Sequence, residues 1–444
     1  MTGARPAVFA LGLAGSWYFT AAPQTLVTVA QSDALRSPRA ARTSDVSADG
    51  RSIAFESRAR LVPADTDDQP DIYVLDRVSG RVTLESGAIG DGEHSHPRIS
   101  GDGRLVVFET RPPYALATPR ADIALHDRVD GTTRLLTKTV RNDNPYGWSR
   151  NPDISDDGRV VAFSSAATTL TDGLDVNGTL EDVYLMRLPG GSISRVSLSA
   201  GGAQLARGDS ILPSLSADGR WVAFASTAAL DDPAAAAAPA GRRPRQVFLR
   251  DAIEGRTTRV APAARRGVPN ADSSLPSISG DGRFVTFVSD ASNLLDDDRN
   301  QASDVFLYDR EADAVTWVSR AADGSPAAGE SLAPVISASG RFVAFQSDAG
   351  NLVCSRRCAE QADDINLIWD AFVFDRTTRQ IVRISEDELG GWMEPSAGPS
   401  LDSMGTIAAF SSKHPVDASD RAGDFDLFVR ALTVAPIITR RPPE

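Results

Sequence analysis

Residues 216–226 read Ser-Ala-Asp-Gly-Arg-Trp-Val-Ala-Phe-Ala-Ser, and near-copies of this stretch begin at Ser47, Ser100, Ser155 and Ser279. The phenylalanine of the stretch recurs at seven places, at intervals of 53 to 65 residues: Phe55, Phe108, Phe163, Phe224, Phe287, Phe345 and Phe410. Self-similarity of this kind is the sequence signature of repeat architectures. The chain is therefore predicted to contain seven copies of one unit, from about residue 43 to residue 431.

Each copy has the same internal order of turns and apolar runs. In the fifth copy, Pro276–Ser279 precedes the turn Asp281–Arg283, and the apolar run Phe284–Phe287 follows the turn. An alternating segment, Asp304–Arg310, and a final run, Ala314–Ser319, complete the copy. Short β-branched and aromatic runs bounded by turn residues are typical of strands, and Asp-Gly suits a tight turn. Each copy is thus predicted to be a four-stranded antiparallel sheet.

Seven such sheets indicate an all-β fold, a seven-bladed β-propeller in which each blade covers the apolar face of the next. The rival is a linear solenoid, which needs polar capping repeats at its ends. Thr25–Ala30 resembles a fourth strand, whereas the seventh copy ends near Leu432 after its third strand. We therefore expect the N-terminal strand to complete the last blade and close the ring, with the tail Ala435–Glu444 as a competitor for that place.

The N-terminus resembles an export signal. Arg5 precedes a mostly apolar run, Ala7–Thr20, and Thr20-Ala21-Ala22 offers small residues for cleavage. The run is shorter than the roughly 20 residues of a membrane span. The expected organisation is a signal peptide or apolar tail over 1–22, the propeller over 23–433 and a tail over 434–444. We expect a periplasmic or secreted monomer without an integral membrane span.

Composition narrows the range of partners and cofactors. The 444 residues carry a formal net charge of −13, which argues against a nucleic-acid partner, because such binding depends on cationic surface. The two cysteines, Cys354 and Cys358, are expected to form a small disulfide loop if the protein is exported, with free thiols as the alternative. A zinc site would need two further ligands, and no other His or Cys lies nearby in the sequence.

The repeat pattern resembles a known family. Pro-x-Ile-Ser-x-Asp-Gly-Arg-x-Val-Ala-Phe-x-Ser, followed by Asp-Val-Phe-x-x-Asp-Arg and Arg-Val-Ser, is similar to the TolB-type, WD-repeat-like β-propeller repeat of exported bacterial proteins. The resemblance covers about residues 24–432. It implies the fold and says little about function, because propellers host binding proteins and several classes of enzyme. TolB itself has an α/β domain before its propeller, and the residues that precede the repeats here are too few for such a domain. The resemblance therefore does not imply a role in the Tol–Pal system.

A loop before the third strand of several copies carries alternating oxygen ligands. The pattern Asp-x-[Asn/Asp]-x-x-x-Asp occurs in the first, fifth and sixth copies, as Asp65, Asp67 and Asp71, as Asp298, Asn300 and Asp304, and as Asp364, Asn366 and Asp370. Hard cations prefer several oxygen ligands, so calcium is one interpretation. The other is an Asx-turn, in which these side chains bond the loop's own backbone.

Candidate recognition residues lie in the loops that enter the first strands. His94 and His96, near Glu93, suggest a metal or acid–base site, and a solvated surface pair is the alternative. Tyr146 and Trp148, and Trp392 before the last copy, are aromatic residues that would bind a ligand if they are exposed at a channel mouth. Core packing or a loop staple is their alternative role. The repeated Asp-Gly-Arg is expected to be structural.

We expect a non-catalytic binding scaffold whose loops meet on one face of the ring and recognise a protein or an envelope glycan. A propeller lyase or hydrolase that acts on polysaccharide at the central channel is the competing interpretation, and it predicts clustered His, Arg and carboxylate groups at one channel mouth. A purely structural envelope module predicts neither arrangement. No catalytic residue is assigned from the sequence.

Overall fold

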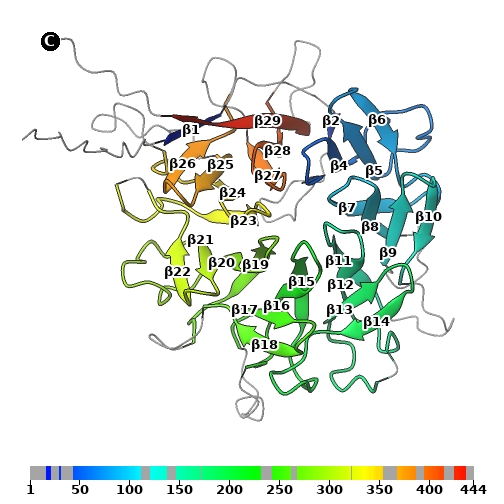
Figure 1. Cartoon of the computed structure of the whole chain (residues 1–444), viewed down its shortest axis with the longest axis horizontal. Helices are drawn as coiled ribbons and strands as arrows, with labels where there is room; N and C mark the ends of the chain where they lie inside the picture. Colours follow the sequence, from blue (N-terminus) through cyan, green and yellow to red (C-terminus); the bar gives the residue numbers. More distant parts are fainter. Residues whose placement is uncertain are drawn as a thin grey trace, which may run out of the picture.

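The computed structural model describes residues 17–21, 30–31, 44–111, 121–137, 147–171, 173–231, 243–261, 268–321, 323–353, 368–386, 395–414 and 425–436. Every regular element in these ranges is a β-strand, and the strands form seven antiparallel sheets arranged around a ring (Figure 1). Within the same ranges no helix has the length and hydropathy needed to cross a membrane. The prediction of an all-β, seven-bladed propeller with four-stranded blades is confirmed.

Each of the first four blades runs from an inner to an outer strand in chain order. Blade 1 contains β3 (Ser44–Val46), β4 (Ser52–Ser57), β5 (Asp71–Asp76) and β6 (Arg81–Leu84). Blade 2 contains β7 (Glu93–Ile99), β8 (Leu105–Arg111), β9 (Asp122–Asp127) and β10 (Thr132–Leu135). Blade 3 contains β11 (Ser149–Ile154), β12 (Val160–Ser165), β13 (Asp182–Arg187) and β14 (Ser192–Arg195). Blade 4 contains β15 (Ser210–Leu215), β16 (Trp221–Ser226), β17 (Gln246–Asp251) and β18 (Arg256–Arg259).

Blades 5 and 6 repeat this order, and blade 7 differs at its outer edge. Blade 5 contains β19 (Ser273–Ile278), β20 (Phe284–Ser289), β21 (Asp304–Asp309) and β22 (Ala314–Trp317). Blade 6 contains β23 (Ser331–Ile336), β24 (Phe342–Ser347), β25 (Asp370–Asp375) and β26 (Gln380–Arg383). Blade 7 contains β27 (Ser396–Leu401), β28 (Ile407–Ser412) and β29 (Phe425–Pro436), with which β1 (Trp17–Ala21) and β2 (Ala30–Gln31) both pair.

The ring is closed by its inner strands. Each inner strand contacts the next, and β27 of blade 7 contacts β3 of blade 1. Seven inter-blade backbone hydrogen bonds of 2.9 to 3.3 Å run around the axis, with the amides donating: Ala48 to Gly101, Gly101 to Asp156, Asp157 to Ala217, Ala217 to Gly280, Gly280 to Ala338, Ser339 to Ser403 and Ser403 to Ala48. This closed circle excludes the linear solenoid.

The strand that was predicted to close the ring lies mostly outside the described residues. Of Thr25–Ala30, only Ala30 lies within the described residues, so closure by that strand stays a prediction. The strand β1 falls within residues 1–22, and removal of that segment on export also stays a prediction.

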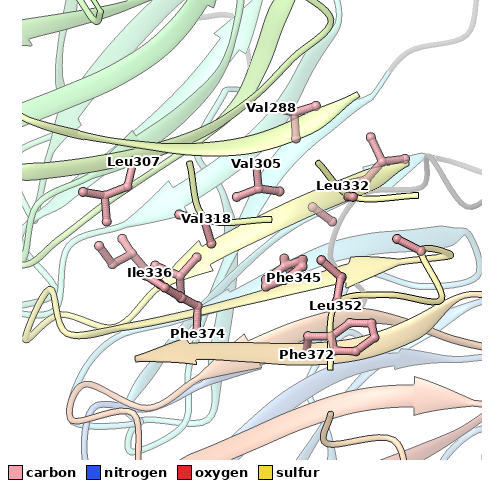
Figure 2. Packing of buried hydrophobic residues seen from close by; sticks show 14 of the residues in the cluster. Val288, Val305, Leu307, Val318, Leu332, Ile336, Phe345, Leu352, Phe372 and Phe374 are labelled. Atoms are coloured by element: carbon pink, nitrogen blue, oxygen red, sulfur yellow. The ribbon is translucent and has the colours of Figure 1, made fainter. Parts of the chain in front are cut away.

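The apolar core lies between neighbouring blades. Between blades 5 and 6, for example, Val305 and Leu307 of β21 lie in one cluster with Ile336, Phe345 and Phe374 of blade 6 (Figure 2). Within six blades the second and third strands also bring two aromatic rings together, at centroid distances of 5.6 to 6.2 Å. Burial of apolar surface on this scale is the main driving force for the fold.

The Asp-Gly-Arg motif is structural, as predicted. In blade 2, Asp102 accepts hydrogen bonds from Ser100 Oγ (2.6 Å) and Arg104 N (3.0 Å), and Gly103 takes a positive φ of 72°. Arg104 then pairs with Asp127, at the end of the third strand, at 2.7 Å. The same Arg–Asp pair occurs in four further blades, as Arg51–Asp76, Arg220–Asp251, Arg283–Asp309 and Arg341–Asp375.

Candidate functional site

The antiparallel order places two sets of connections on opposite faces of the ring. One face carries the loops between the second and third strands and the loops that lead into the next blade; we call it the loop face. The other carries the Asp-Gly-Arg turns and the turns between the third and fourth strands; we call it the turn face. All the sequence-predicted ligand-binding and metal residues within the described ranges belong to loop-face connections or to strand ends at that face.

The channel mouth on the loop face is shaped by a repeated bulge. In blades 2 to 6 the inner strand shifts register at a residue of positive φ that is followed by proline, and these residues are His96, Asn151, Leu212, Leu275 and Ala333. Bulges re-aim side chains, and proline removes a ladder donor. All five residues line a single cavity, which we call the mouth cavity.

One side of the mouth cavity holds an imidazole between two carboxyl groups. His96 Nδ1 lies 3.3 Å from Oε1 of Glu109, whose side chain is only 1% exposed, and Glu109 Oε1 also accepts the amide of Asn151 at 2.7 Å. Glu56, from blade 1, also acts on His96 through its charge and accepts a hydrogen bond from the His96 amide. Glu56 lies 40 positions before His96, in blade 1, whereas Glu109 lies 13 positions after His96, on the neighbouring strand of blade 2.

The surroundings raise the pKa values of His96 and Glu56 and lower the pKa of Glu109. Burial acts to lower the pKa of His96, but the charges of Glu109 and Glu56 outweigh it and raise that pKa. Burial acts to raise the pKa of Glu109, but His96 and the Asn151 amide outweigh it and lower that pKa. The pKa of Glu56 is raised, chiefly by burial. A proton donor and a proton acceptor therefore lie side by side, which is the arrangement that acid–base chemistry uses.

The rest of the mouth cavity is divided between an ion pair and an apolar surface. Arg98 Nε lies 3.4 Å from Asp153 Oδ1. Opposite lie Leu212, Leu275 and Ala333 with the prolines that follow them, from blades 4 to 6. A ligand in this cavity would meet polar groups from blades 2 and 3 on one side and apolar groups on the other.

The channel mouth on the turn face is acidic. Asp45 and Asp153 accept the amides of Ile99 and Leu215 in the next blades, at 2.9 and 2.7 Å. Asp156 lies in the same cavity as these two residues. Burial, together with the charges of Asp45, Asp153 and Asp157, raises the pKa of Asp156 to about 6.

The structure gives the two predicted histidines different environments. His94 is 1% exposed, its ring meets Phe108 edge-on at 5.7 Å, and burial lowers its pKa. On the third strand, Ala124 pairs with Phe108, and the six other blades carry an aromatic residue at the position of Ala124. His94 therefore occupies space that an aromatic ring fills in those blades. His96 instead lines the mouth cavity. Sequence reasoning missed its partners: Glu56 belongs to another blade, and Glu109, on the next strand of the same blade, comes opposite this position only through the strand register.

Trp148 is half-buried and held in place from two sides. Its indole Nε1 donates to Glu181 Oε1 at 2.5 Å, and the guanidinium of Arg150 lies over its ring, 5.2 Å from the centroid. Arg150 also pairs with Glu181. These contacts describe a loop staple, and a recognition role for Trp148 stays a proposal. Tyr146 and Trp392 lie outside the described residues, as do Cys354 and Cys358.

Blade 1 brings the three predicted calcium ligands together. One carboxylate oxygen from each of Asp65, Asp67 and Asp71 lies within 4.8 Å of the other two. Asp65 accepts the Tyr73 hydroxyl at 2.5 Å and the Asp67 amide at 3.2 Å, and Asp67 accepts the Gln69 amide at 2.8 Å. The Asx-turn interpretation therefore holds for Asp65 and Asp67, and Asp71 accepts the hydroxyl of Ser86.

In blade 3 the equivalent group surrounds a side-chain amide. Gln204 Nε2 donates to Asp175 Oδ1, Asn177 Oδ1 and Asp182 Oδ2 at 2.9, 2.8 and 2.7 Å. Arg195 lies 3.3 Å from Asp175 and 3.2 Å from Asp182. Protein nitrogen donors thus occupy the place where a cation would be held. Gln204 lies 22 positions or more from the three residues that it bonds, and no local pattern predicts that it reaches this loop.

The loops of blades 5 and 6 are less complete as oxygen sites. In blade 5, Asn300 Nδ2 donates to Asp304 Oδ2 at 2.9 Å, and the pKa of Asp298 is raised to about 6 by burial and by the charges of Asp304 and Asp297. In blade 6, Asp370 accepts the Ser385 hydroxyl at 2.6 Å. Asp364 and Asn366 lie outside the described residues.

Comparison with known proteins shows the fold alone. No protein-family model and no curated protein matches this sequence. An oligogalacturonate lyase in complex with manganese is 12% identical, with a TM-score of 0.53 over 94% of this chain and 98% of that chain. The propeller domain of the trilobed protease from Pyrococcus furiosus is 10% identical, with a TM-score of 0.51 over 90% of this chain and 98% of that chain. A putative TolB from Agrobacterium tumefaciens is 20% identical over 63% of this chain and 81% of its own, with a TM-score of 0.38.

Proposed function

We propose that this protein is an exported binding scaffold, periplasmic or secreted, that captures a segment of a partner protein in the mouth cavity of the loop face. The observation that supports this proposal is the divided lining of that cavity. Leu212, Leu275 and the adjoining prolines suit an apolar side chain, while His96 and Asn151 suit the polar backbone of a peptide. Pockets of this composition, mainly apolar with a few oriented polar groups, are typical of ligand sites.

An envelope glycan is the other ligand that the sequence suggests. Sugar binding commonly relies on an exposed aromatic platform, and among the residues that the structure describes none that lines the mouth cavity is a Phe, Tyr or Trp. Of the three aromatic residues predicted to bind a ligand, Trp148 lies within the described residues, and Glu181 and Arg150 hold its ring in place. The lining therefore favours a peptide.

Binding of immobilised peptides and of envelope polysaccharide fragments would test this proposal. Leu275→Trp fills the cavity and should reduce peptide capture at least tenfold. Val129→Trp, an equally bulky change at an exposed position (73% exposed) on the turn face, is the matched control and should have no effect. Capture of glycans in place of peptides, or equal capture by the Leu275→Trp variant, would count against the proposal.

A second candidate is an enzyme, a lyase or hydrolase that acts on polysaccharide at the channel. The His96, Glu109 and Glu56 cluster favours it, because carboxyl and imidazole groups with separated pKa values are what such chemistry needs. Chain cleavage of a polysaccharide panel that is lost in both His96→Gln and Glu109→Gln would support the enzyme. A folded protein that cleaves nothing in the panel would leave the cluster with a structural or binding role.

We also propose that blade 1 binds calcium with weak affinity through Asp65, Asp67 and Asp71. The convergence of their oxygens supports the proposal, and Ca²⁺ commonly takes carboxylate ligands from alternating positions of one loop. Blade 3 carries its own nitrogen donors at the equivalent place, so it is not part of the proposal.

A further inference from the structure

The boundary between blades 1 and 2 carries polar side chains at three positions that are defined by the strand order. These positions are the first residue of the second strand, the residue after the fourth strand, and the fifth residue of the next blade's third strand. Three other boundaries place apolar residues there, within one cluster each: Leu105, Leu136 and Met186; Trp221, Val260 and Tyr308; Phe284, Val318 and Phe374. Between blades 1 and 2 the residues are Ser52, Glu85 and His126.

The polar residues at this boundary form a fully bonded cluster. Glu85, 3% exposed, lies 3.0 Å from His126 Nε2 through one oxygen, and its other oxygen accepts from Thr83 Oγ1 (2.5 Å) and Arg128 Nε (3.3 Å). His126 Nδ1 in turn lies 2.7 Å from Thr133 Oγ1. Burial acts to raise the pKa of Glu85, but His126, Thr83 and Arg128 outweigh it and lower that pKa, so the carboxylate is ionised. A charged group is thus built into a position that is apolar elsewhere, and it fixes Arg128.

Among the described residues, Arg128 has no aromatic ring beneath it, and its side chain is 22% exposed. Its Nη1 donates to the carbonyl of Gly103 at 2.7 Å and to Ser52 Oγ at 3.5 Å. In blades 5 and 6 the equivalent arginines, Arg310 and Arg376, lie over the rings of Trp221 and Phe284, 4.0 and 4.1 Å from the centroids. The residue at the equivalent place beneath Arg128 is Ser52. A groove of about 740 Å³ opens on the turn face here, lined among others by Ser52, Arg128 and Arg81. Its volume is in the range of sites for small molecules.

The groove is lined by four acidic residues and four arginines, and three of those arginines have partners: Arg51 pairs with Asp76, Arg104 with Asp127 and Arg128 with Glu85. Its acidic residues are engaged: Asp49 by Ser47 and the Arg51 amide, Asp76 by Arg51, Asp102 by Ser100 and the Arg104 amide, and Glu85 as described. Arg81 is exposed and makes no side-chain hydrogen bond or ion pair with any described residue. Guanidinium groups present five donors in a planar fork that matches carboxylate and phosphate oxygens.

We propose that this groove binds a small, sugar-sized molecule that carries a carboxylate or phosphate group, with Arg81 and Arg128 holding the anion. The Glu85–His126 pair positions Arg128 for this contact. The site lies on the face opposite the mouth cavity, so the proposal stands or fails independently of the proposed function.

Titration calorimetry of the full chain with glucose 6-phosphate, glucuronate and glucose tests the proposal. We expect the first, the second or both to bind and neutral glucose to give no heat; the response shows whether the anion is phosphate or carboxylate. Arg81→Gln should weaken binding at least fivefold. Arg256→Gln is the matched control, because Arg256 is the exposed first residue of the fourth strand in blade 4 and should leave affinity unchanged.

A filling variant separates loss of the site from loss of the fold. Ser52→Phe restores the residue type of Phe284, and Gly103 would face it as Gly340 faces Phe284. It should abolish binding while the melting temperature stays the same or rises. No heat from either anion with the wild-type protein, equal weakening by Arg256→Gln, or undiminished binding by Ser52→Phe would each overturn the proposal.

Discussion

The amide of Ser403 donates to the carbonyl of Ala48 across 3.3 Å, although the two residues lie 355 positions apart in the chain. This bond joins the seventh blade to the first and completes the circle of inter-blade hydrogen bonds around the channel. The circle runs through the Asp-Gly-Arg turns, so the most repeated motif of the sequence also sets the distance between blades. Because it involves backbone groups only, the circle forms although its residues differ in type from blade to blade.

A glycine in these turns also allows close approach of the next blade. Gly282 has a φ of +70°, and a Cβ there would lie 2.2 Å from the ring of Trp221. Gly255 has a φ of +68°, but a Cβ there would meet only the end of Arg250 at 3.6 Å. We expect Gly255→Ala to destabilise the fold by about 1 kcal/mol through backbone strain, and Gly282→Ala by about 2–4 kcal/mol through strain and overlap. Urea unfolding measures both, and equal losses would show that the contact with Trp221 has no energetic weight.

Asp156 predicts a dependence of stability on pH. Its folded pKa of about 6 lies above the unfolded value of 3.8, so the folded state binds more protons between these values and loses stability as the pH rises through that window. The difference of about two units sets a ceiling of about 3 kcal/mol, which solvent screening reduces to about 1–2 kcal/mol.

Asp156→Asn should therefore stabilise the protein at pH 7 by about that amount, and the gain should vanish below about pH 4. Urea midpoints of both proteins between pH 4 and 8 test this expectation. Asp130→Asn, at an exposed position (59% of its side chain), is the control. A constant difference across the range would rule out titration of Asp156 as the cause.

His96 and Glu109 predict a second pH effect, at higher pH. The folded pKa of His96 is raised, so the stability from its pairing with Glu109 is complete below the ordinary value of about 6.5 and is lost as the pH rises through the folded pKa. Glu109→Gln should lower stability at pH 6 and flatten the decline above about pH 6.5. Glu93→Gln, on an exposed neighbouring side chain, should leave the decline intact. A decline that persists in Glu109→Gln would assign it to another group.

The sequence predicts the repeat better than it predicts the sites. Strand positions follow from local patterns, such as the apolar run after Asp281-Gly282, because each blade folds from contiguous residues. The mouth cluster joins Glu56, His96 and Glu109 from two blades, and a linear sequence does not show which side chains meet across a blade boundary. His94 illustrates the converse. It lies near the start of a strand on the loop face, where the sequence suggests a ligand-binding residue, yet the small side chain of Ala124 leaves room for it in the interior.

The proposed calcium site of blade 1 has an internal control in blade 3. Millimolar calcium should raise the melting temperature of the wild-type protein by a few degrees, because an ion that binds only the folded state stabilises it. Asp67→Asn should remove most of this shift, whereas Asp175→Asn should keep it, since Gln204 and Arg195 already occupy that loop. Burial and the charges of Asp65, Asp67 and Asp91 raise the pKa of Asp71 to about 6, so protons compete with the cation and the shift should be smaller at pH 5.5 than at pH 7.5. A melting temperature that ignores both calcium and EDTA at pH 7.5 would leave the Asx-turn as the whole role of this loop.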